Sequence, residues 1–318
     1  MSLPSLEVRL TPPDIRPWVA GNALPGVWSF TAPASGPHVA LVAVMHGNEI
    51  AGAVLLDRWL RAGLRPLRGR LSLIFANLAA YGRFAADDPL ATRFLDEDMN
   101  RVWDTETLAG GRRSCELKRA RELLPLLQTV DVLLDLHSML WPSDSLILAG
   151  EAPRAHRLGL ALGTPPLVVA DHGHEAGRRL IDHARFTTGA EGPTALLLEA
   201  GHHWQEATVT QMEVSAARLL RLHGVVAADA PPLPPPPATE APAARLATVT
   251  RTVTAATDKF AFVRAFRGGD VIAARNTLIA LDGEAEIRTP HADCLLVMPC
   301  QRVSRGHTAV RLARFADD

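Results

Sequence analysis

The sequence predicts an α/β protein with a doubly wound, mostly parallel sheet and a smaller C-terminal all-β domain. Three observations indicate this fold class. Apolar, β-branched segments alternate with segments of helical spacing over residues 1–226. A proline-rich segment, typical of a semi-rigid spacer, follows at residues 227–244. Residues 245–318 then contain short β-like segments separated by glycine-containing turns. We therefore expect an α/β domain, a linker and a small β-rich domain with these bounds.

The elements of the first domain follow from the spacing of apolar residues. Residues 39–44 (VALVAV) form a continuous apolar run, which is typical of a strand buried on both faces. Residues 49–62 have helical spacing, because Ile50, Val54 and Leu60 can share one face. The same criteria predict strands at 70–75, 130–136, 145–148, 167–170 and 193–198, and helices at 114–128 and 208–223. In such a sheet, ligands bind outside the carboxyl ends of the strands.

The second domain is predicted to contain strands alone. Glycine pairs and Asp-Gly or Arg-Gly dipeptides supply the turns between its short apolar segments. The predicted strands are residues 248–253, 260–265, 270–272, 277–281, 294–298 and 309–312.

Composition and charge exclude several classes of function. The chain has 318 residues, 47% of them apolar and 21% charged, with a net charge of -1. These totals give no electrostatic basis for binding nucleic acid or an anionic membrane. Residues 1–25 contain no apolar segment of a signal peptide, and no run is long enough to span a bilayer. With three cysteines, an odd and sparse count, we expect a cytoplasmic protein. Oligomeric state stays open, a homo-oligomer included.

Three potential metal ligands follow predicted strands. His46 and Glu49 lie in the turn between the first strand and its helix, and His137 lies just past the strand at 130–136. Imidazole and carboxylate are ligands that suit zinc, and catalytic zinc sites use three protein ligands. Glu199 lies just past a further apolar strand. A solvated loop-end residue explains any one position as well, but together the positions favour one shared metal, because isolated buried charges are costly.

A polar loop supplies planar hydrogen-bond donors. Residues 92–101 have no helix or strand period and include Arg93, Asn100 and Arg101. Arginine is suited to bidentate binding of a carboxylate. Taken alone, a surface loop with paired aspartates and arginines explains the same segment. Two other His–Glu pairs, at residues 172–175 and 203–206, are predicted to be solvated loops, with shaping of the pocket mouth as a secondary role for the second.

The motifs together resemble a known family. HGNE at 46–49, NLAA at 77–80, RFLDEDMNR at 93–101, DLHS at 135–138 and LLEAG at 197–201 occur in the order found in the succinylglutamate desuccinylase/aspartoacylase family of the zinc-carboxypeptidase superfamily. The resemblance covers residues 39–201, and the β-rich tail is where the family places its second domain. The expected fold is therefore zinc-carboxypeptidase-like.

The resemblance implies a function and a set of site residues. One zinc ion per subunit would be bound by His46, Glu49 and His137, and Glu199 would be the general acid and base. Arg93 would polarise the scissile carbonyl, and Asn100 with Arg101 would hold a substrate carboxylate. The implied reaction is hydrolysis of the amide bond of a small, carboxylate-bearing N-acyl amino acid or amine.

Departures from the family pattern leave alternatives open. The sole tyrosine is Tyr81, although aspartoacylases use tyrosine in substrate contacts. The family's acyl-pocket arginine has three nearby candidates, Arg178, Arg179 and Arg185. Asp135 is expected to be structural. A zinc carboxypeptidase that acts on peptides and a catalytically silent member of the family remain alternatives, and the β domain could be a carbohydrate- or protein-binding module.

Overall fold

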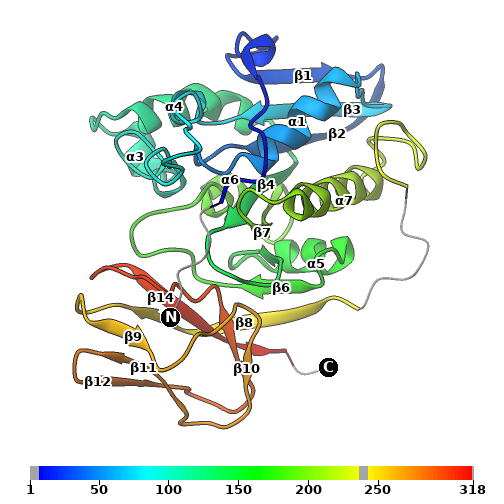
Figure 1. Ribbon diagram of the computed structural model, residues 1–318. Helices are drawn as coiled ribbons and strands as arrows, with labels where there is room; N and C mark the ends of the chain where they lie inside the picture. The colour runs from blue at the N-terminus through cyan, green and yellow to red at the C-terminus, as the bar shows by residue number, and fades with distance from the viewer. Residues whose placement is uncertain (1–6, 236–242, 317–318) are drawn as a thin grey trace.

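A single large sheet runs through the protein. The computed structural model describes residues 7–235 and 243–316. Eleven strands are hydrogen-bonded in the order β1-β3-β2-β4-β7-β5-β6-β8-β14-β13-β10 (Figure 1). Their bounds are β1 Val27–Thr31, β2 Ala34–Ala43, β3 Arg68–Phe75, β4 Val132–Met139, β5 Leu146–Leu148, β6 Leu167–Ala170, β7 Thr194–His202, β8 Arg245–Thr254, β10 Val271–Ile272, β13 Cys294–Val297 and β14 Thr308–Phe315.

Helices cover both faces of the sheet. Alternate side chains of β2 enter different cores: Val39, Leu41 and Ala43 pack with α1 and α7, whereas Ala40 and Val42 pack on the side of α4. The longer helices are α1 Ala51–Arg61, α4 Cys115–Leu127, α5 Pro153–Leu162 and α7 Glu206–Leu222. Short helical segments are η1 Arg16–Trp18, α2 Leu78–Tyr81, η2 Met99–Arg101, α3 Thr105–Ala109, η3 Leu180–Asp182 and α6 Ala184–Thr187. None of the helices among the described residues has the length and apolarity to cross a membrane.

The register of the central strands brings their carboxyl ends together. Strands β2, β4 and β7 are mutually parallel neighbours. Val42 pairs with Asp135, and His137 pairs with Glu199. The carboxyl end of β2 therefore lies beside His137, one strand away from Glu199.

The C-terminal part continues the same sheet. Strand β8 pairs in parallel with β6, and β14, β13 and β10 follow in antiparallel order. A separate three-stranded sheet contains β9 Phe260–Phe262, β11 Leu278–Asp282 and β12 Ala285–Arg288, and lies at the end of the molecule opposite β1 (Figure 1). Residues 236–242 of the expected linker lie outside the described residues, and the division into two domains stays a prediction.

The structure confirms the fold class and the strands and helices predicted from spacing, with shifted bounds. It adds β1, β12, α5 and the short helical segments, which spacing did not indicate. It also corrects the placement of two site residues. His137 and Glu199 lie inside β4 and β7 instead of just past them, because the ladder between these strands continues beyond their apolar segments.

Candidate metal centre and active site

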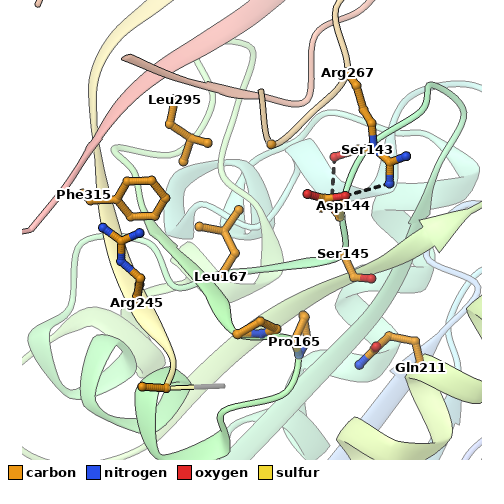
Figure 2. A pocket seen from close by; sticks show the side chains of 13 residues that line it. Ser143, Asp144, Ser145, Pro165, Leu167, Gln211, Arg245, Arg267, Leu295 and Phe315 are labelled. Atoms are coloured by element: carbon orange, nitrogen blue, oxygen red, sulfur yellow. Dashed lines mark hydrogen bonds and ion pairs between the residues drawn. The ribbon is translucent and has the colours of Figure 1, made fainter. Parts of the chain in front are cut away.

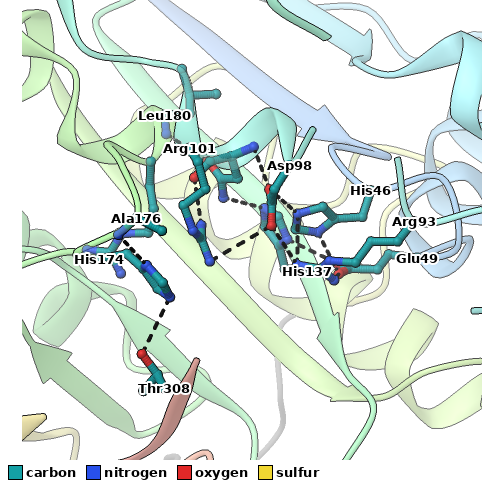
Figure 3. A network of polar contacts seen from close by, with 12 residues as sticks. His46, Glu49, Arg93, Asp98, Arg101, His137, His174, Ala176, Leu180 and Thr308 are labelled. Atoms are coloured by element: carbon teal, nitrogen blue, oxygen red, sulfur yellow. Dashed lines mark hydrogen bonds and ion pairs between the residues drawn. The ribbon is translucent and has the colours of Figure 1, made fainter. Parts of the chain in front are cut away.

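Three side chains from separate segments converge at the carboxyl ends of β2 and β4. Ligand atoms of His46, Glu49 and His137 all lie within 4.8 Å of one another, and all three residues are buried. Nδ1 of His46 lies 2.7 Å from one oxygen of Glu49, and Nδ1 of His137 lies 3.0 Å from the other. Figure 3 shows the two imidazoles and the carboxylate grouped together. The structure thus brings together the three residues that the sequence predicted as ligands.

The turn that carries His46 and Glu49 has an unusual backbone. Val44 leaves β2 with a φ of 54°, which is rare for a β-branched residue and ends the strand abruptly. Gly47 follows in a crowded position, where an added Cβ would lie 2.4 Å from the carbonyl carbon of Ala80 and 2.5 Å from the oxygen of Thr92. Glycine is therefore required here, because only it permits this close approach of three chain segments.

The outer nitrogens of both histidines face aspartates. Nε2 of His46 lies 2.9 Å from Asp98, and Nε2 of His137 lies 2.9 Å from Asp135. Apart from this contact, neither oxygen of the fully buried Asp135 has a donor among the described residues. Histidine ligands of metals commonly contact a carboxylate through their other ring nitrogen. Two imidazoles, each in contact with an aspartate, and a carboxylate that accepts from Arg93 and from the N–H of Ser138 are a donor set that fits zinc.

Glu199 is a buried carboxyl group beside this cluster. Its side chain projects from β7, next to His137 on β4, and its Oε2 has no hydrogen-bond partner among the described residues. Burial raises the pKa of Glu199 to about 8; the nearby charge of Glu49 acts in the same direction, whereas His137 and Arg93 oppose it. A carboxyl group in this state can hold or release a proton near neutral pH.

A buried glutamate anchors the polar loop 92–101. Glu116, in the first turn of α4, accepts hydrogen bonds from the backbone N–H groups of Leu95, Asp96 and Glu97 at 2.7 to 3.3 Å. It also accepts one from Asn77 at 3.2 Å. Sequence reasoning missed this role, since Glu116 appears there as one charged residue in the first turn of an ordinary helix.

The loop delivers Arg93 and Asp98 to the metal-ligand cluster. Arg93 donates to Glu49 at 3.2 Å and to Asp98 at 3.2 Å. Burial favours the neutral form of Asp98, but His46 and Arg93 outweigh it and hold its pKa well below the usual range. The outcome is a chain of contacts from the loop to His46, which Figure 3 displays.

The two residues expected to hold a substrate carboxylate differ in their freedom. The Asn100 amide accepts from the N–H of Leu180 at 2.8 Å and lies 3.3 Å from Nε2 of His137, so it is engaged within the protein. Arg101 donates to the Asn100 carbonyl at 2.6 Å and approaches Asp98 only at 3.9 Å. Burial lowers the pKa of Arg101 to about 10; the charge of Asp98 opposes this shift, whereas the charge of Arg93 adds to it. Arg101 therefore retains donors for a ligand.

Several residues lie where sequence reasoning did not place them. The prediction of a solvated loop is wrong for His203, which is buried and whose Nδ1 lies 2.6 Å from the hydroxyl oxygen of Ser138. His174 is half-buried and lines the cavity, and Asp135 contacts a predicted ligand. Arg179 is buried between Asp171 and Asp182. No pattern of local spacing distinguishes these positions from surface residues, because strands far apart in sequence enclose them.

The cluster lies in a cavity of about 580 Å³ that also receives residues of the C-terminal strands. Its lining includes Arg101, Trp141, Met298, Thr308 and Arg311. A second cavity, of about 520 Å³, lies between Arg245 and Phe315 on one side and Asp144 and Gln211 on the other (Figure 2). Among the described residues, the group that could hold a metal ion lies in the first cavity.

The fold and the site define a class of protein: an α/β chain that presents a metal-capable His–Glu–His group and a buried carboxyl group at the carboxyl edge of parallel strands. Residues 35–223, more than half of the chain, match the model of the succinylglutamate desuccinylase/aspartoacylase catalytic domain. The protein belongs to the succinylglutamate desuccinylase/aspartoacylase family, which confirms the resemblance seen in the motifs.

Individual relatives match in shorter segments. The chain is 31% identical over 111 residues to the aspartoacylase of Xenopus tropicalis, a segment that covers 31% of this chain and 33% of that protein. It is 34% identical over 125 residues to the succinylglutamate desuccinylase of Pseudomonas syringae pv. tomato, covering 36% and 35%. The chain thus spans about a third of the length of these relatives.

Solved structures match the fold over nearly the whole chain. The succinylglutamate desuccinylase of Vibrio parahaemolyticus has a TM-score of 0.66 at 17% identity, covering 92% of this chain and 87% of that one. A succinylglutamate desuccinylase/aspartoacylase of Rhodobacter sphaeroides has a TM-score of 0.66 at 18% identity, covering 92% and 89%. The described architecture, with its C-terminal strands, is therefore shared with these proteins.

Proposed function

We propose that this protein hydrolyses the amide bond of a small, carboxylate-bearing N-acyl amino acid or amine, using one Zn²⁺ held by His46, Glu49 and His137. The observation that carries the proposal is the convergence of these three side chains beside Glu199 in one cavity. Family membership supports the reaction class, since the names of the relatives describe deacylases.

The chemistry follows from the residues that surround the cluster. A zinc ion held by His46, Glu49 and His137 would supply Lewis acidity and would lower the pKa of a water molecule toward neutrality. Glu199, the buried carboxyl group beside the cluster, takes up a proton on its carboxylate and returns it to the leaving nitrogen. These are the two proton transfers that amide hydrolysis requires.

Two arginines have complementary roles in the proposal. Arg93, beside Glu49, stabilises the negative charge that develops on the carbonyl oxygen, a type of contribution worth roughly 3–4 kcal/mol per donor. Arg101 binds a substrate carboxylate and so orients the scissile bond. Asn100 supports that loop through its contacts with Leu180 and His137.

Two variants test the proposal. His46→Ala should lose zinc and hydrolysis together. Glu199→Gln should keep zinc and lose turnover by about 10²- to 10⁴-fold, because the metal ligands are intact and the proton carrier is gone. Zinc analysis and a screen of N-acetyl, N-succinyl and other N-acyl amino acids and diamines provide the readouts. The exposed residues His172 and Glu206 supply matched controls as His172→Ala and Glu206→Gln.

Three results would contradict the proposal in different ways. Near-normal turnover of Glu199→Gln would remove this residue from the mechanism. Faster cleavage of C-terminal residues from peptides than of N-acyl amino acids would identify a carboxypeptidase. Zinc-loaded wild type without activity on either panel would identify a catalytically silent family member.

A further inference from the structure

Arg311 brings a cationic side chain from the C-terminal strands into the active-site cavity. It lies in the middle of β14, where it pairs with Val297 of β13 and Thr252 of β8. It is only 8% exposed, and it lines the same cavity as His46 and Glu199. Its position is outside residues 35–223, the segment that matches the catalytic-domain model.

The guanidinium of Arg311 is poorly satisfied. Its Nε is buried and donates no hydrogen bond to any described residue. Its ion pair within the described part of the chain is a contact of 3.6 Å between Nε and Asp171. A guanidinium has five donor hydrogens, and burying such a group without close partners costs several kcal/mol.

The neighbouring carboxylates are already used by another arginine. Arg179 donates to both oxygens of Asp171 at 2.9 and 2.7 Å. It also donates to both oxygens of Asp182 at 2.7 and 3.0 Å. Arg179 is therefore a structural residue of this network, whereas Arg311, which lines the cavity, has a buried Nε that finds no hydrogen-bond acceptor among the described residues.

The surroundings of Arg311 favour an anion. His174 lies at the same side of the cavity, with its Nε2 3.5 Å from the hydroxyl of Thr308 (Figure 3). Burial, together with the charges of Arg101 and Arg311, lowers the pKa of His174 to about 3. Its Nδ1 accepts from the N–H of Ala176 at 3.1 Å, so the neutral ring carries its proton on Nε2. The cavity wall thus presents a neutral donor beside a cation.

We propose that Arg311 is a specificity residue that binds an anionic group of the substrate, separate from the carboxylate assigned to Arg101. This inference rests on the proposed function for the identity of the substrate. If Arg311 has this role, the C-terminal strands contribute to the selection of substrates by charge. The substrate site of the matched catalytic domain is then incomplete without β14.

Isosteric substrate pairs isolate the charge. N-acetylglutamate and N-acetylglutamine differ in charge on the amino-acid half, and N-succinylglutamine and its succinamoyl counterpart differ on the acyl half. Wild type should prefer the charged member of at least one pair. Arg311→Gln should raise KM for that member roughly 10- to 100-fold, the loss expected for hydrogen bonds to a charged group, and leave kcat and the neutral member unchanged. Arg251→Gln, at an exposed arginine on the adjacent β8, controls for net charge.

Binding of an inert dicarboxylate gives a readout that does not depend on turnover. Glutarate should bind wild type more tightly than its half-amide glutaramate in calorimetry, and Arg311→Gln should abolish that difference. If wild type hydrolyses no N-acyl amino acid but shows this difference, the proposed function fails and the role of Arg311 stands. If wild type hydrolyses the panel while Arg311→Gln leaves selectivity and glutarate binding unchanged, the role of Arg311 fails alone.

A second variant covers the case in which Arg311→Gln does not fold. Arg311→Lys keeps the charge and should retain part of the preference for the charged member. Wild type without preference in either substrate pair, or an Arg311→Lys variant with the full selectivity and glutarate affinity of wild type, overturns the inference.

Discussion

Replacing Glu116 by glutamine should loosen the loop that carries Arg93 and Arg101. The carboxylate of Glu116 accepts four hydrogen bonds, two on each oxygen. Glutamine has nearly the same shape but keeps only one acceptor oxygen. Its amide nitrogen would face two N–H donors whichever way the group is turned, so two bonds are lost.

The expected cost follows from these contacts. A hydrogen bond to a charged group contributes about 1.5–3 kcal/mol, so two lost bonds give roughly 3–6 kcal/mol. The backbone of Asp96 and Glu97 lies in an exposed to half-buried part of the loop, where water can replace part of this loss. We therefore expect the free energy of unfolding to fall by about 2–4 kcal/mol, with weaker substrate binding because the loop is less ordered.

Denaturant unfolding measures this change, and limited proteolysis within residues 92–101 locates it. Glu122→Gln is the matched control, because Glu122 is an exposed residue of the same helix. The anchoring role would be refuted if the free energy of unfolding of Glu116→Gln lay within about 0.5 kcal/mol of the wild-type value and its proteolysis were unchanged. Ordinary surface substitutions set this limit.

Three further predictions concern a neighbour of the predicted metal ligands, the turn that carries two of these ligands, and a buried histidine of the sheet. Asp98→Asn removes the charge facing Nε2 of His46 and should weaken zinc binding about 10- to 100-fold in chelator competition, whereas exposed Asp87→Asn should not; equal affinities would contradict this. Gly47→Ala should cost about 1–3 kcal/mol in denaturant unfolding because its Cβ overlaps backbone, while Gly111→Ala, with nothing within 4 Å, serves as its control. Burial and, second, the charge of Arg70 lower the pKa of His38 from 6.5 to about 4, so the folded state keeps the ring neutral. The unfolded chain binds a proton at higher pH than the folded protein, and stability is therefore lost as pH falls from 6.5 to about 4. His38→Gln should reduce that slope by at most about 1.4 kcal/mol per pH unit, and an unchanged slope would rule out His38 as its source.

Strand and helix positions were predictable where local pattern and tertiary environment agree. Strand β2 is apolar on consecutive residues because both of its faces are buried, and that pattern survives in the sequence. Helix α5 was not predicted. Its Gly159 is unfavourable in a helix, yet an added Cβ would lie 2.9 Å from Val168 of β6, so the residue serves close packing. The need for a small residue at this contact with β6 cannot be inferred from the local sequence.

The burial of His203 also could not be predicted from local sequence. The sequence places His203 beside other polar residues, which predicts a solvated loop. In the structure, its N–H donates to the carbonyl of Met139 at 2.8 Å and continues the pairing of β7 with β4. Its polarity is the same in either location, and only the partner strand determines that it is buried.

The sequence by itself determined the fold class and the family motifs, and it predicted that His46, Glu49, His137 and Glu199 lie near one another, because short-range periodicity and the rule for parallel strands place such residues at one edge of a sheet. The tertiary structure alone decided which buried charges are fully hydrogen-bonded and which are not. Arg179 and Arg311 are both arginines near an active site, but one is enclosed by two aspartates and the other faces the cavity. The two aspartates that enclose Arg179 lie within eight residues of it, whereas Arg311 reaches the same Asp171 from the distant strand β14. Because β14 is brought to this cavity only by the pairing of the sheet, local sequence pattern carries no record of that contact.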